Sequence, residues 1–256
     1  MLDEEKNISQ KDREAVREAI DRGYLVTLAT GRMYRSALSY AQELGIKLPL
    51  VTYNGALVKD PSTGKTLAHW PLALETAKCI VGELLDQDIY VQAYVNDTLL
   101  VPADCAKAQY YAKFSRVPFE VAGAGLRQLA EAPHKLLVID DDPEPIRRHL
   151  VTVYGNAIKI VSSSKGFLEI TDPETNKWRA LQFLMKRFEV TREEILTVGD
   201  SDNDYEMVAH AGVGVAMGNA KETIQKAARI ITASNTQSGV SLILRSVMTN
   251  QVDVPE

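Results

Sequence analysis

Three aspartates sit at alternate positions directly after an apolar run. The stretch LTVGDSDNDYEMVAHAG, residues 196–212, carries Asp200, Asp202 and Asp204 where a strand pattern changes to a helix pattern. Clustered carboxylates repel one another, so keeping several at one place is costly unless a cation shares them. An oxygen ligand set without His or Cys predicts a hard ion, above all Mg²⁺. The alternative is a solvated helix start, where Asp is common as a cap.

Two further segments could hold the anion that such a cation would accompany. In LATGR, Thr30 could donate its hydroxyl, and the N–H groups of Gly31 and Arg32 could bind an anionic oxygen, since helix starts are natural phosphate sites. Lys177 follows DPETN at a predicted helix start, where the dipole disfavours a cation unless an anion lies opposite. Taken singly, LATGR fits an ordinary turn equally well, and Lys177 fits an exposed lysine better.

These residues need elements that bring them together. Helix and strand patterns alternate at both ends of the chain, which predicts an α/β fold with a parallel sheet covered on both faces. Predicted strands at 24–30, 48–55 and 195–200 end in LATGR, TYNG and TVGDSDND. Ligands of open α/β sheets bind at the carboxyl ends of the strands, so we expect the three segments to converge on one site.

The middle of the chain follows a different pattern. A predicted hairpin at 56–70 breaks the βα alternation, and from about Leu74 to Thr171 helices alternate with paired strands. The alternation resumes after DPETN. We therefore predict two domains, a core of residues 1–73 and 172–256 and an inserted α+β cap of residues 74–171.

Composition limits the classes of function. The chain has 256 residues, of which 45% are hydrophobic and 25% charged, and a net charge of −5, so we expect neither a nucleic-acid nor a membrane partner. Cys79 and Cys105 lack metal or redox spacing, which is typical of a reducing compartment. There is no apolar stretch of the roughly 18 residues that a membrane helix needs. We expect a cytoplasmic protein, monomeric or homodimeric.

In their order and spacing, these segments resemble a known family. LATGR, YNGA, a lysine followed after two residues by AL, then GDSDND and VAMGNA are similar to the haloacid dehalogenase (HAD) superfamily of phosphatases. More narrowly, they resemble its Cof-type, sugar-phosphatase-like branch. The resemblance covers essentially the whole chain. It implies a Rossmann-like parallel-sheet core with an α+β cap inserted after the third core strand.

The resemblance also implies roles for single residues. Mg²⁺ would be the cofactor, with Asp200 as its ligand and Asp204 beside it orienting the waters of the metal or the phosphate. Thr30 would bind the phosphoryl oxygens, and Lys177 would neutralise charge on the phosphoryl group and the nucleophile. The substrate would be a small phosphorylated metabolite, and the residues that bind it would be Gly31, Arg32, Asn54, Gly55 and Asn203.

The sequence departs from the family at its beginning. Family members open with a buried strand ending in Asp-x-Asp-Gly-Thr, whose first aspartate is the nucleophile and whose second is the general acid/base. The 256 residues lack this motif ahead of LDEEKNIS. Asp140 and Asp142 make an Asp-x-Asp pair, but Pro143 replaces the glycine and the pair falls in the predicted cap. The missing strand would leave two central ladder edges unpaired, so we expect the natural chain to be longer upstream.

Three functions of different classes follow. The preferred one is a Mg²⁺-dependent phosphatase of small phosphate monoesters, whose 256-residue chain as written is inactive or weakly active. The others are a non-catalytic protein that binds phosphate and metal, and a structural protein whose motifs are remnants. The cap would select the substrate, and its polar residues Tyr90, Gln92, Tyr94 and Lys159 fit core or surface as readily as substrate contacts.

Overall fold

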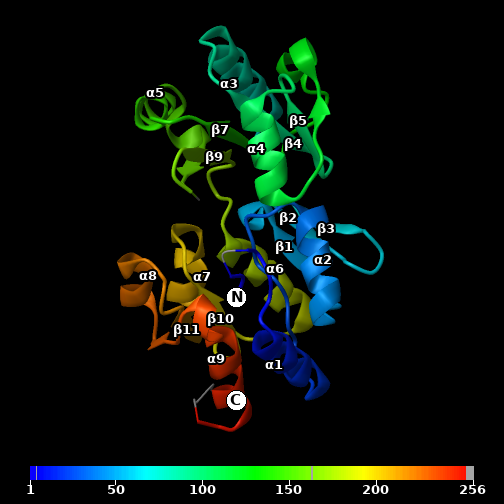
Figure 1. Cartoon of the computed structure of the whole chain (residues 1–256), viewed down its shortest axis with the longest axis vertical. Coiled ribbons are helices and arrows are strands. Elements are labelled where there is room, and N and C mark those ends of the chain that lie inside the picture. The colour runs from blue at the N-terminus through cyan, green and yellow to red at the C-terminus, as the bar shows by residue number, and fades with distance from the viewer. Residues whose placement is uncertain (4, 163, 252–256) are drawn as a thin grey trace.

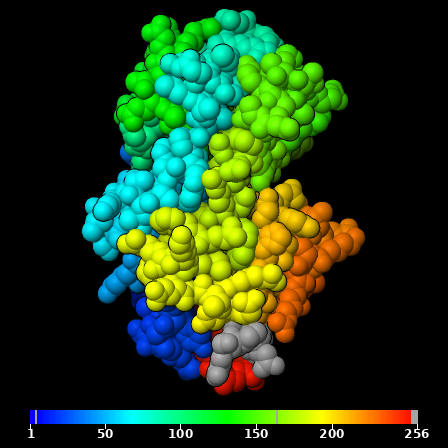
Figure 2. Space-filling view, turned by 180° about the vertical axis from the view of Figure 1, so that it is seen from behind, coloured from blue at the N-terminus to red at the C-terminus, as the bar shows by residue number. Residues whose placement is uncertain are grey.

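The two lobes of the molecule are stacked along its long axis. The computed structural model describes residues 1–3, 5–162 and 164–251. Both ends of the chain build the lower lobe and its middle builds the upper one, as the colours of Figures 1 and 2 show. The chain crosses between the lobes at residues 70–73 and 172–176. The upper lobe is called the cap and the lower lobe the core from here on.

The cap is a sheet of its own with helices on both faces. The order is β6-β5-β4-β7-β9-β8, and every pairing is antiparallel except that of β5 with β6. Side chains of a strand alternate between faces. Leu136, Val138, Leu168 and Ile170 therefore pack under α3 and α5, while Leu137 and Phe167 on the other face join a cluster with α4. The cap elements are α3 (Leu74–Asp86), β4 (Val91–Val95), β5 (Thr98–Val101), α4 (Ala106–Ser115), β6 (Glu120–Val121), η2 (Gly123–Gln128), β7 (Lys135–Ile139), α5 (Glu144–Tyr154), η3 (Gly155–Ala157), β8 (Lys159–Val161) and β9 (Phe167–Thr171).

The core carries two short sheets flanked by helices. One is antiparallel, β1-β2-β3, and contains the hairpin predicted at 56–70; the other is parallel, β10-β11-β12. Ser9 caps α1 as an acceptor of the Asp12 N–H at 3.1 Å, and α1 packs on α9 at the foot of the molecule (Figure 1). The core elements are α1 (Gln10–Asp21), α2 (Tyr34–Leu44), β1 (Leu50–Thr52), η1 (Tyr53–Gly55), β2 (Leu57–Lys59), β3 (Thr66–His69), α6 (Lys177–Phe188), β10 (Leu196–Gly199), η4 (Asp202–Asp204), α7 (Tyr205–His210), β11 (Val213–Ala216), α8 (Glu222–Ala227), β12 (Ile230–Ile231), η5 (Asn235–Gln237) and α9 (Gly239–Met248).

One predicted core strand is wrong. Residues 24–30 form a ladder with β1 only through an isolated parallel bridge between Ala29 and Val51. Tyr24 and Leu25 are exposed, at 44% and 57% of their full accessible surface. Within the described residues, no strand lies between this segment and β10, which pairs only with β11. The segment has apolar residues of strand type, but it lacks the second neighbour that would make it a central strand.

The element boundaries agree with an inserted cap. β3 ends at His69, the first cap helix begins at Leu74, the last cap strand ends at Thr171, and α6 begins at Lys177. The bounds 1–73, 74–171 and 172–256 stay a prediction of the domain limits. No helix in the described part of the chain has the length and apolar content needed to cross a membrane.

Candidate active site

The loop after β10 folds back on one carboxylate. Ser201 and Asp204 form a capping box, in which the Oδ2 atom of Asp204 accepts the N–H groups of Asp200 at 2.9 Å and of Ser201 at 3.0 Å. The loop is so tight that a Cβ on Gly199 would lie 2.5 Å from the Cβ of Asp204. The sequence GDSDND thus uses its last aspartate to hold the loop and turns Asp200 outward.

Lys177 lies at the first position of α6 and points to the same carboxylate. Asn176 caps this helix by accepting the Arg179 N–H at 2.8 Å. The Lys177 Nζ lies 2.5 Å from the Oδ1 of Asp204, with both side chains buried, and 3.5 Å from the Oδ1 of Asn203. The anion that a cation at this helix start requires is therefore Asp204.

The donor set suits a hard cation at Asp200 and not at Asp204. Both oxygens of Asp204 are engaged by Lys177 and by two N–H groups. Asp200 is exposed, and among the described residues its oxygens make only long contacts, with the Ser201 hydroxyl at 3.2 Å and the Asn219 amide at 3.4 Å. Mg²⁺ is commonly held by one or two carboxylates together with water and substrate phosphate. Asp200 fits that role, while Asp204 supports the loop that carries it.

The third aspartate of the motif does not face the site. Asp202 is exposed and pairs with Lys221, and its other oxygen accepts the Thr223 hydroxyl at 3.4 Å. Across residues 1–3, 5–162 and 164–251, no group of three or more His, Cys, Asp or Glu is arranged to hold a metal. Of the three aspartates, Asp200 and Asp204, which were assigned to the metal from the sequence, lie on the site side of the loop, and Asp202 faces Lys221.

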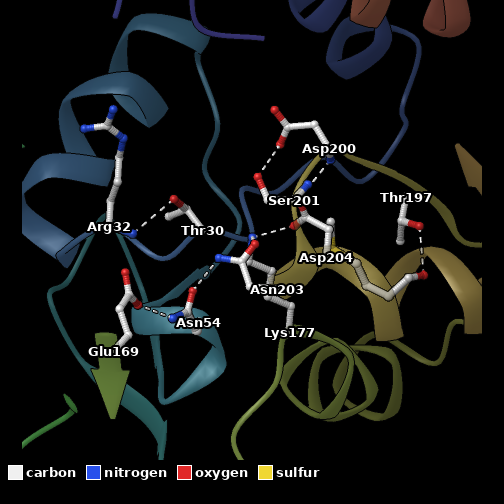
Figure 3. Close-up of polar contacts among 11 residues, drawn as sticks. Thr30, Arg32, Asn54, Glu169, Lys177, Thr197, Asp200, Ser201, Asn203 and Asp204 are labelled. Atoms are coloured by element: carbon white, nitrogen blue, oxygen red, sulfur yellow. Dashed lines mark hydrogen bonds and ion pairs between the residues drawn. The ribbon is translucent and has the colours of Figure 1, made fainter. Parts of the chain in front are cut away.

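The LATGR turn offers donors to an anion. The Thr30 Oγ1 accepts the Arg32 N–H at 3.2 Å, which leaves the hydroxyl proton to be donated elsewhere. Among the described residues, the Gly31 N–H has no hydrogen-bond partner. The Arg32 N–H donates to the Thr30 hydroxyl. The Arg32 guanidinium points away from the site (Figure 3) and lies over the Tyr40 ring, 5.3 Å from its centroid. Thr30 and Gly31 therefore present donors, and the predicted Arg32 N–H does not.

The YNG turn places an amide between the two halves of the site. Tyr53, Asn54 and Gly55 all have positive φ, at 51°, 60° and 102°. A bulky residue such as Tyr53 rarely takes this conformation, and such strain clusters at functional sites. The turn directs Asn54 so that its Oδ1 accepts the Asn203 amide at 2.9 Å. It is secured by the Tyr53 hydroxyl, which donates to the Oδ1 of Asp97 in the cap at 2.6 Å.

Glycine is required where these turns meet. A Cβ on Gly31 would lie 2.5 Å from the Asn54 Oδ1, and one on Gly55 would lie 2.2 Å from the Asn176 carbonyl oxygen. The LATGR turn, the YNG turn and the start of α6 thus touch one another directly. Figure 3 shows Thr30, Asn54, Asn203, Lys177 and Asp204 arranged side by side, with Asp200 at the rim.

The cap closes over this cluster and adds residues that the sequence analysis missed. Lys135 and Glu169 are buried, and Glu169 accepts the Asn54 amide N–H at 2.5 Å. The available signal was the single charged residue in each of the apolar runs KLLVI and FLEIT, because a charge in a buried strand needs a partner. A small pocket beside them is lined by Asn54, Lys159, Val161, Thr171, Thr175, Asn176 and Asn203. Of the four cap residues weighed from the sequence, Lys159 reaches this pocket, and its Nζ lies 2.9 Å from the Oε1 of Glu206 in the core.

The Asp-x-Asp pair, Asp140 and Asp142, belongs to the cap and makes its contacts there. Asp140 follows β7, accepts the Asp142 N–H at 3.1 Å and lies 3.5 Å from the Lys107 ammonium. Pro143 directly precedes α5. This pair ends a cap strand and starts a cap helix, as predicted from the proline.

Known proteins share this architecture. A family model described as haloacid dehalogenase-like hydrolase matches residues 1–244. The chain is 31% identical to the 5-amino-6-(5-phospho-D-ribitylamino)uracil phosphatase YitU of Bacillus subtilis in an alignment of 258 positions, which covers 96% of this chain and 93% of the relative. It is 27% identical to the phosphatase YwtE of the same organism, named for the same substrate, with 98% and 96% covered.

Solved structures agree along the whole chain. A haloacid dehalogenase-like hydrolase from Bacteroides thetaiotaomicron has a TM-score of 0.89 at 25% identity, covering 96% of this chain and 95% of its own. TM0651 from Thermotoga maritima has a TM-score of 0.84 at 34% identity, covering 95% and 92%. The resemblance inferred from LATGR, GDSDND and VAMGNA is confirmed. The chain belongs to the haloacid dehalogenase-like hydrolase family.

Proposed function

We propose that this site binds small phosphate monoesters together with Mg²⁺ and serves their hydrolysis. The main observation is that three separate turns, LATGR, YNG and GDSDND, bring a hydroxyl, amides and an outward carboxylate to one place, where Lys177 joins them from the start of α6. Phosphoryl transfer depends mainly on positioning and charge neutralisation around the transferred group. The phosphatase names of the relatives support the same reaction class.

Each residue has a part in this proposal. The Thr30 hydroxyl and the Gly31 N–H donate to the phosphoryl oxygens. Lys177 supplies positive charge and is held ready by Asp204, while Asn54 and Asn203 fix the orientation of the bound group. Asp200 would hold Mg²⁺, which neutralises phosphoryl charge when bound.

The chemistry also needs a nucleophile and an acid, and the residues at the site do not supply them. Asp204 is tied to Lys177, Asp140 and Asp142 lie in the cap, and Glu169 is engaged by Asn54 and Lys135. We therefore infer that the 256-residue chain binds phosphate esters but turns them over hardly or not at all. A non-catalytic phosphate- and metal-binding protein is the second candidate, favoured by the lack of an Asp-x-Asp pair among the residues of the candidate site.

The substrate class that we propose rests on the relatives and on the polar side chains around Asn54. Thr171, Thr175 and Lys159 line a hollow beside Asn54 whose free volume of about 10 Å³ is enough for one water molecule. Hydroxyl, amide and ammonium groups of this kind recognise hydroxyl-rich leaving groups by hydrogen bonds. YitU is named for a phosphorylated ribitylamino compound. We propose sugar-phosphate-like esters, including polyol phosphates, as the substrates of the Cof-type assignment.

Phosphate release tests this function. The mass-verified chain would be incubated with phosphorylated sugars, polyols and cofactors, with Mg²⁺ or with EDTA. We expect turnover near background, and Mg²⁺-dependent release once a strand carrying Asp-x-Asp is fused upstream. Substituting Asp200→Ala in the fused chain should abolish that release. Robust EDTA-sensitive activity of the unfused chain would show that another residue is the nucleophile.

A further inference from the structure

A buried ion pair of the cap lies directly over the candidate site. Lys135 opens β7 and Glu169 lies in β9, on the sheet face opposite to α3 and α5. The Lys135 Nζ is 3.0 Å from the Oε2 of Glu169, and the side chains are only 2% and 7% exposed. Burial alone would lower the pKa of Lys135, but the neighbouring Glu169 and Tyr111 outweigh it and the pKa is raised. The lysine is therefore held charged inside the protein.

Both members of the pair reach across into the core. The Lys135 Nζ donates to the carbonyl oxygen of Gly31 at 3.2 Å. Glu169 accepts the Nδ2 hydrogen of Asn54 at 2.5 Å. Gly31 and Asn54 belong to the two turns to which the anion site was assigned. One cap ion pair thus holds both turns.

The contact with Glu169 decides which atoms Asn54 presents. A carboxylate can only accept, so it must face the amide nitrogen of Asn54 and turn the Oδ1 the other way. That oxygen accepts the Asn203 amide at 2.9 Å, which in turn leaves the Asn203 Oδ1 facing Lys177 at 3.5 Å. Donors and acceptors alternate along the series from cap to core. A substitution of Glu169, at the cap end of this series, would therefore leave the side-chain amides of Asn54 and Asn203 without a fixed orientation.

Stability alone does not account for such a pair. Taking two charges out of water is costly, and apolar residues of similar volume often replace buried pairs without loss of stability. On the same sheet face, buried Leu137 lies opposite Glu169 and buried Tyr94 lies opposite Lys135. The pair thus has a desolvation cost that apolar residues would avoid. Its hydrogen bonds go to Gly31 and Asn54 of the candidate site.

We propose that Lys135 and Glu169 are positioning residues, which orient Asn54 and hold the Gly31 turn so that phosphate binding in the core is coupled to docking of the cap. The inference rests on the proposed function, since it concerns the same anion site. Coupling is reciprocal, so bound phosphate stabilises the docked cap by the factor by which the docked cap favours phosphate.

The test uses the full chain with inorganic phosphate and Mg²⁺, followed by NMR titration. The variant Lys135→Met/Glu169→Leu removes both charges together. We expect phosphate affinity to fall roughly ten- to a hundredfold, as for loss of a hydrogen bond to a charged group. The side-chain amide signal of Asn54 should shift, while the urea midpoint stays equal to that of the parent or rises.

Two further variants keep the test decisive. Glu169→Gln retains an acceptor for Asn54, so it should restore part of the affinity and most of the Asn54 amide position. Arg35→Met removes a cap–core ion pair with the Oδ2 of Asp97 at 3.5 Å but keeps the Tyr53 hydrogen bond to the Oδ1 of Asp97 and the backbone N–H of residue 35, so it should bind phosphate like the parent. If the double variant fails to fold, Glu169→Gln and Arg35→Met still give the comparison.

The outcomes separate the two proposals. If the parent chain binds no phosphate, the proposed function is wrong and this inference is wrong with it. If the parent binds and the Lys135/Glu169 variants bind equally with an unmoved Asn54 amide, the positioning role alone is wrong. Equal losses in the Arg35→Met control would also overturn it, because cap docking in general would then be responsible.

Discussion

At the scale of residues, the site is organised around the buried carboxylate of Asp204. It joins Lys177 to the loop that carries Asp200, through contacts of 2.5, 2.9 and 3.0 Å. Neither charge can be left alone in the interior without a large penalty. The Lys177–Asp204 ion pair therefore stabilises the loop after β10 and also sets the net charge that a ligand meets at the site.

Removing the lysine should destabilise the protein strongly. We expect Lys177→Met to lower the free energy of unfolding by about 3–5 kcal/mol, because Asp204 would remain buried without its cation. The matched control is Lys221→Met, which breaks the exposed pair with Asp202 and should cost less than about 1 kcal/mol. Urea denaturation measures both. Similar small losses for the two variants would contradict the buried pair.

Asp200 should matter for metal and not for folding. It is exposed and has weak partners, so Asp200→Asn should leave the urea midpoint nearly unchanged. In calorimetric titration, Mg²⁺ binding in the presence of phosphate should disappear. Asp202→Asn, at the next exposed aspartate, should bind Mg²⁺ like the parent. Loss of binding in both variants, or in neither, would count against Asp200 as the ligand.

The residue patterns predicted part of this site. Thr30, Asn54, Asn203 and Asp204 lie close together, as was expected of the three strand-end segments, and Lys177 joins them from the start of α6. Two details depended on side-chain direction, which sequence spacing does not reveal. The Arg32 side chain turns onto α2, and the carboxylate of Asp204 pairs with Lys177. The cap residues Lys135 and Glu169 could not be assigned, because their role arises only when two lobes far apart in sequence meet.

At the scale of elements, the YNG turn and the start of α6 are in direct backbone contact. Gly55 has φ of 102°, and a Cβ there would lie 2.2 Å from the Asn176 carbonyl oxygen. Backbone cannot move aside as a flexible side chain can. The close approach therefore fixes the distance between Asn54 and Lys177.

Replacing glycine by alanine should destabilise the protein much more at this contact than at a turn with open space around it. We expect Gly55→Ala to cost about 2–5 kcal/mol, combining left-handed strain with overpacking. Gly64→Ala is the matched control, since Gly64 has φ of 69° and nothing within 4 Å, and it should cost about 1–2 kcal/mol. Thermal and urea unfolding give both values. Equal costs would show that the contact yields easily.

Elements were predicted best where their pattern was local. The hairpin at 56–70 and the helices and paired strands expected between Leu74 and Thr171 follow from local alternation. The strand at 24–30 failed, since its apolar run is strand-like but its ladder is reduced to Ala29 with Val51. Pairing depends on a neighbour, and the periodicity of one segment does not reveal whether that neighbour is there.

At the scale of the whole molecule, two histidines lie where cap and core meet. His134 precedes β7 and its Nδ1 is 2.8 Å from the Nε2 of His69 in β3, while its ring stacks on Tyr53 with centroids 4.4 Å apart. Burial, with His69 and Lys59 nearby, lowers the pKa of His134 to about 3. Burial also lowers the pKa of His69, against an opposing effect of Glu131.

Acid should therefore weaken the fold from near neutrality. Below the ordinary histidine pKa of about 6.5, the unfolded chain takes up protons that the folded chain refuses, so stability falls as the pH falls towards 3. Between pH 7 and pH 5, His134 alone contributes a loss of up to about 2 kcal/mol. His134→Gln should flatten this slope in urea denaturation, whereas His210→Gln, at an exposed position, should not. An NMR titration of His134 with a midpoint near 6.5 would contradict the prediction.

The most direct test of the whole account is whether phosphate and Mg²⁺ meet at the convergent turns. Backbone and side-chain amide signals of the labelled 256-residue chain would be followed during phosphate titration, with and without Mg²⁺. The account predicts saturable shifts at Gly31, Asn54 and Asn203, tightened by Mg²⁺ in the parent and not in Asp200→Asn. Absence of saturable shifts at these residues, or binding that Mg²⁺ and Asp200 do not affect, would contradict it.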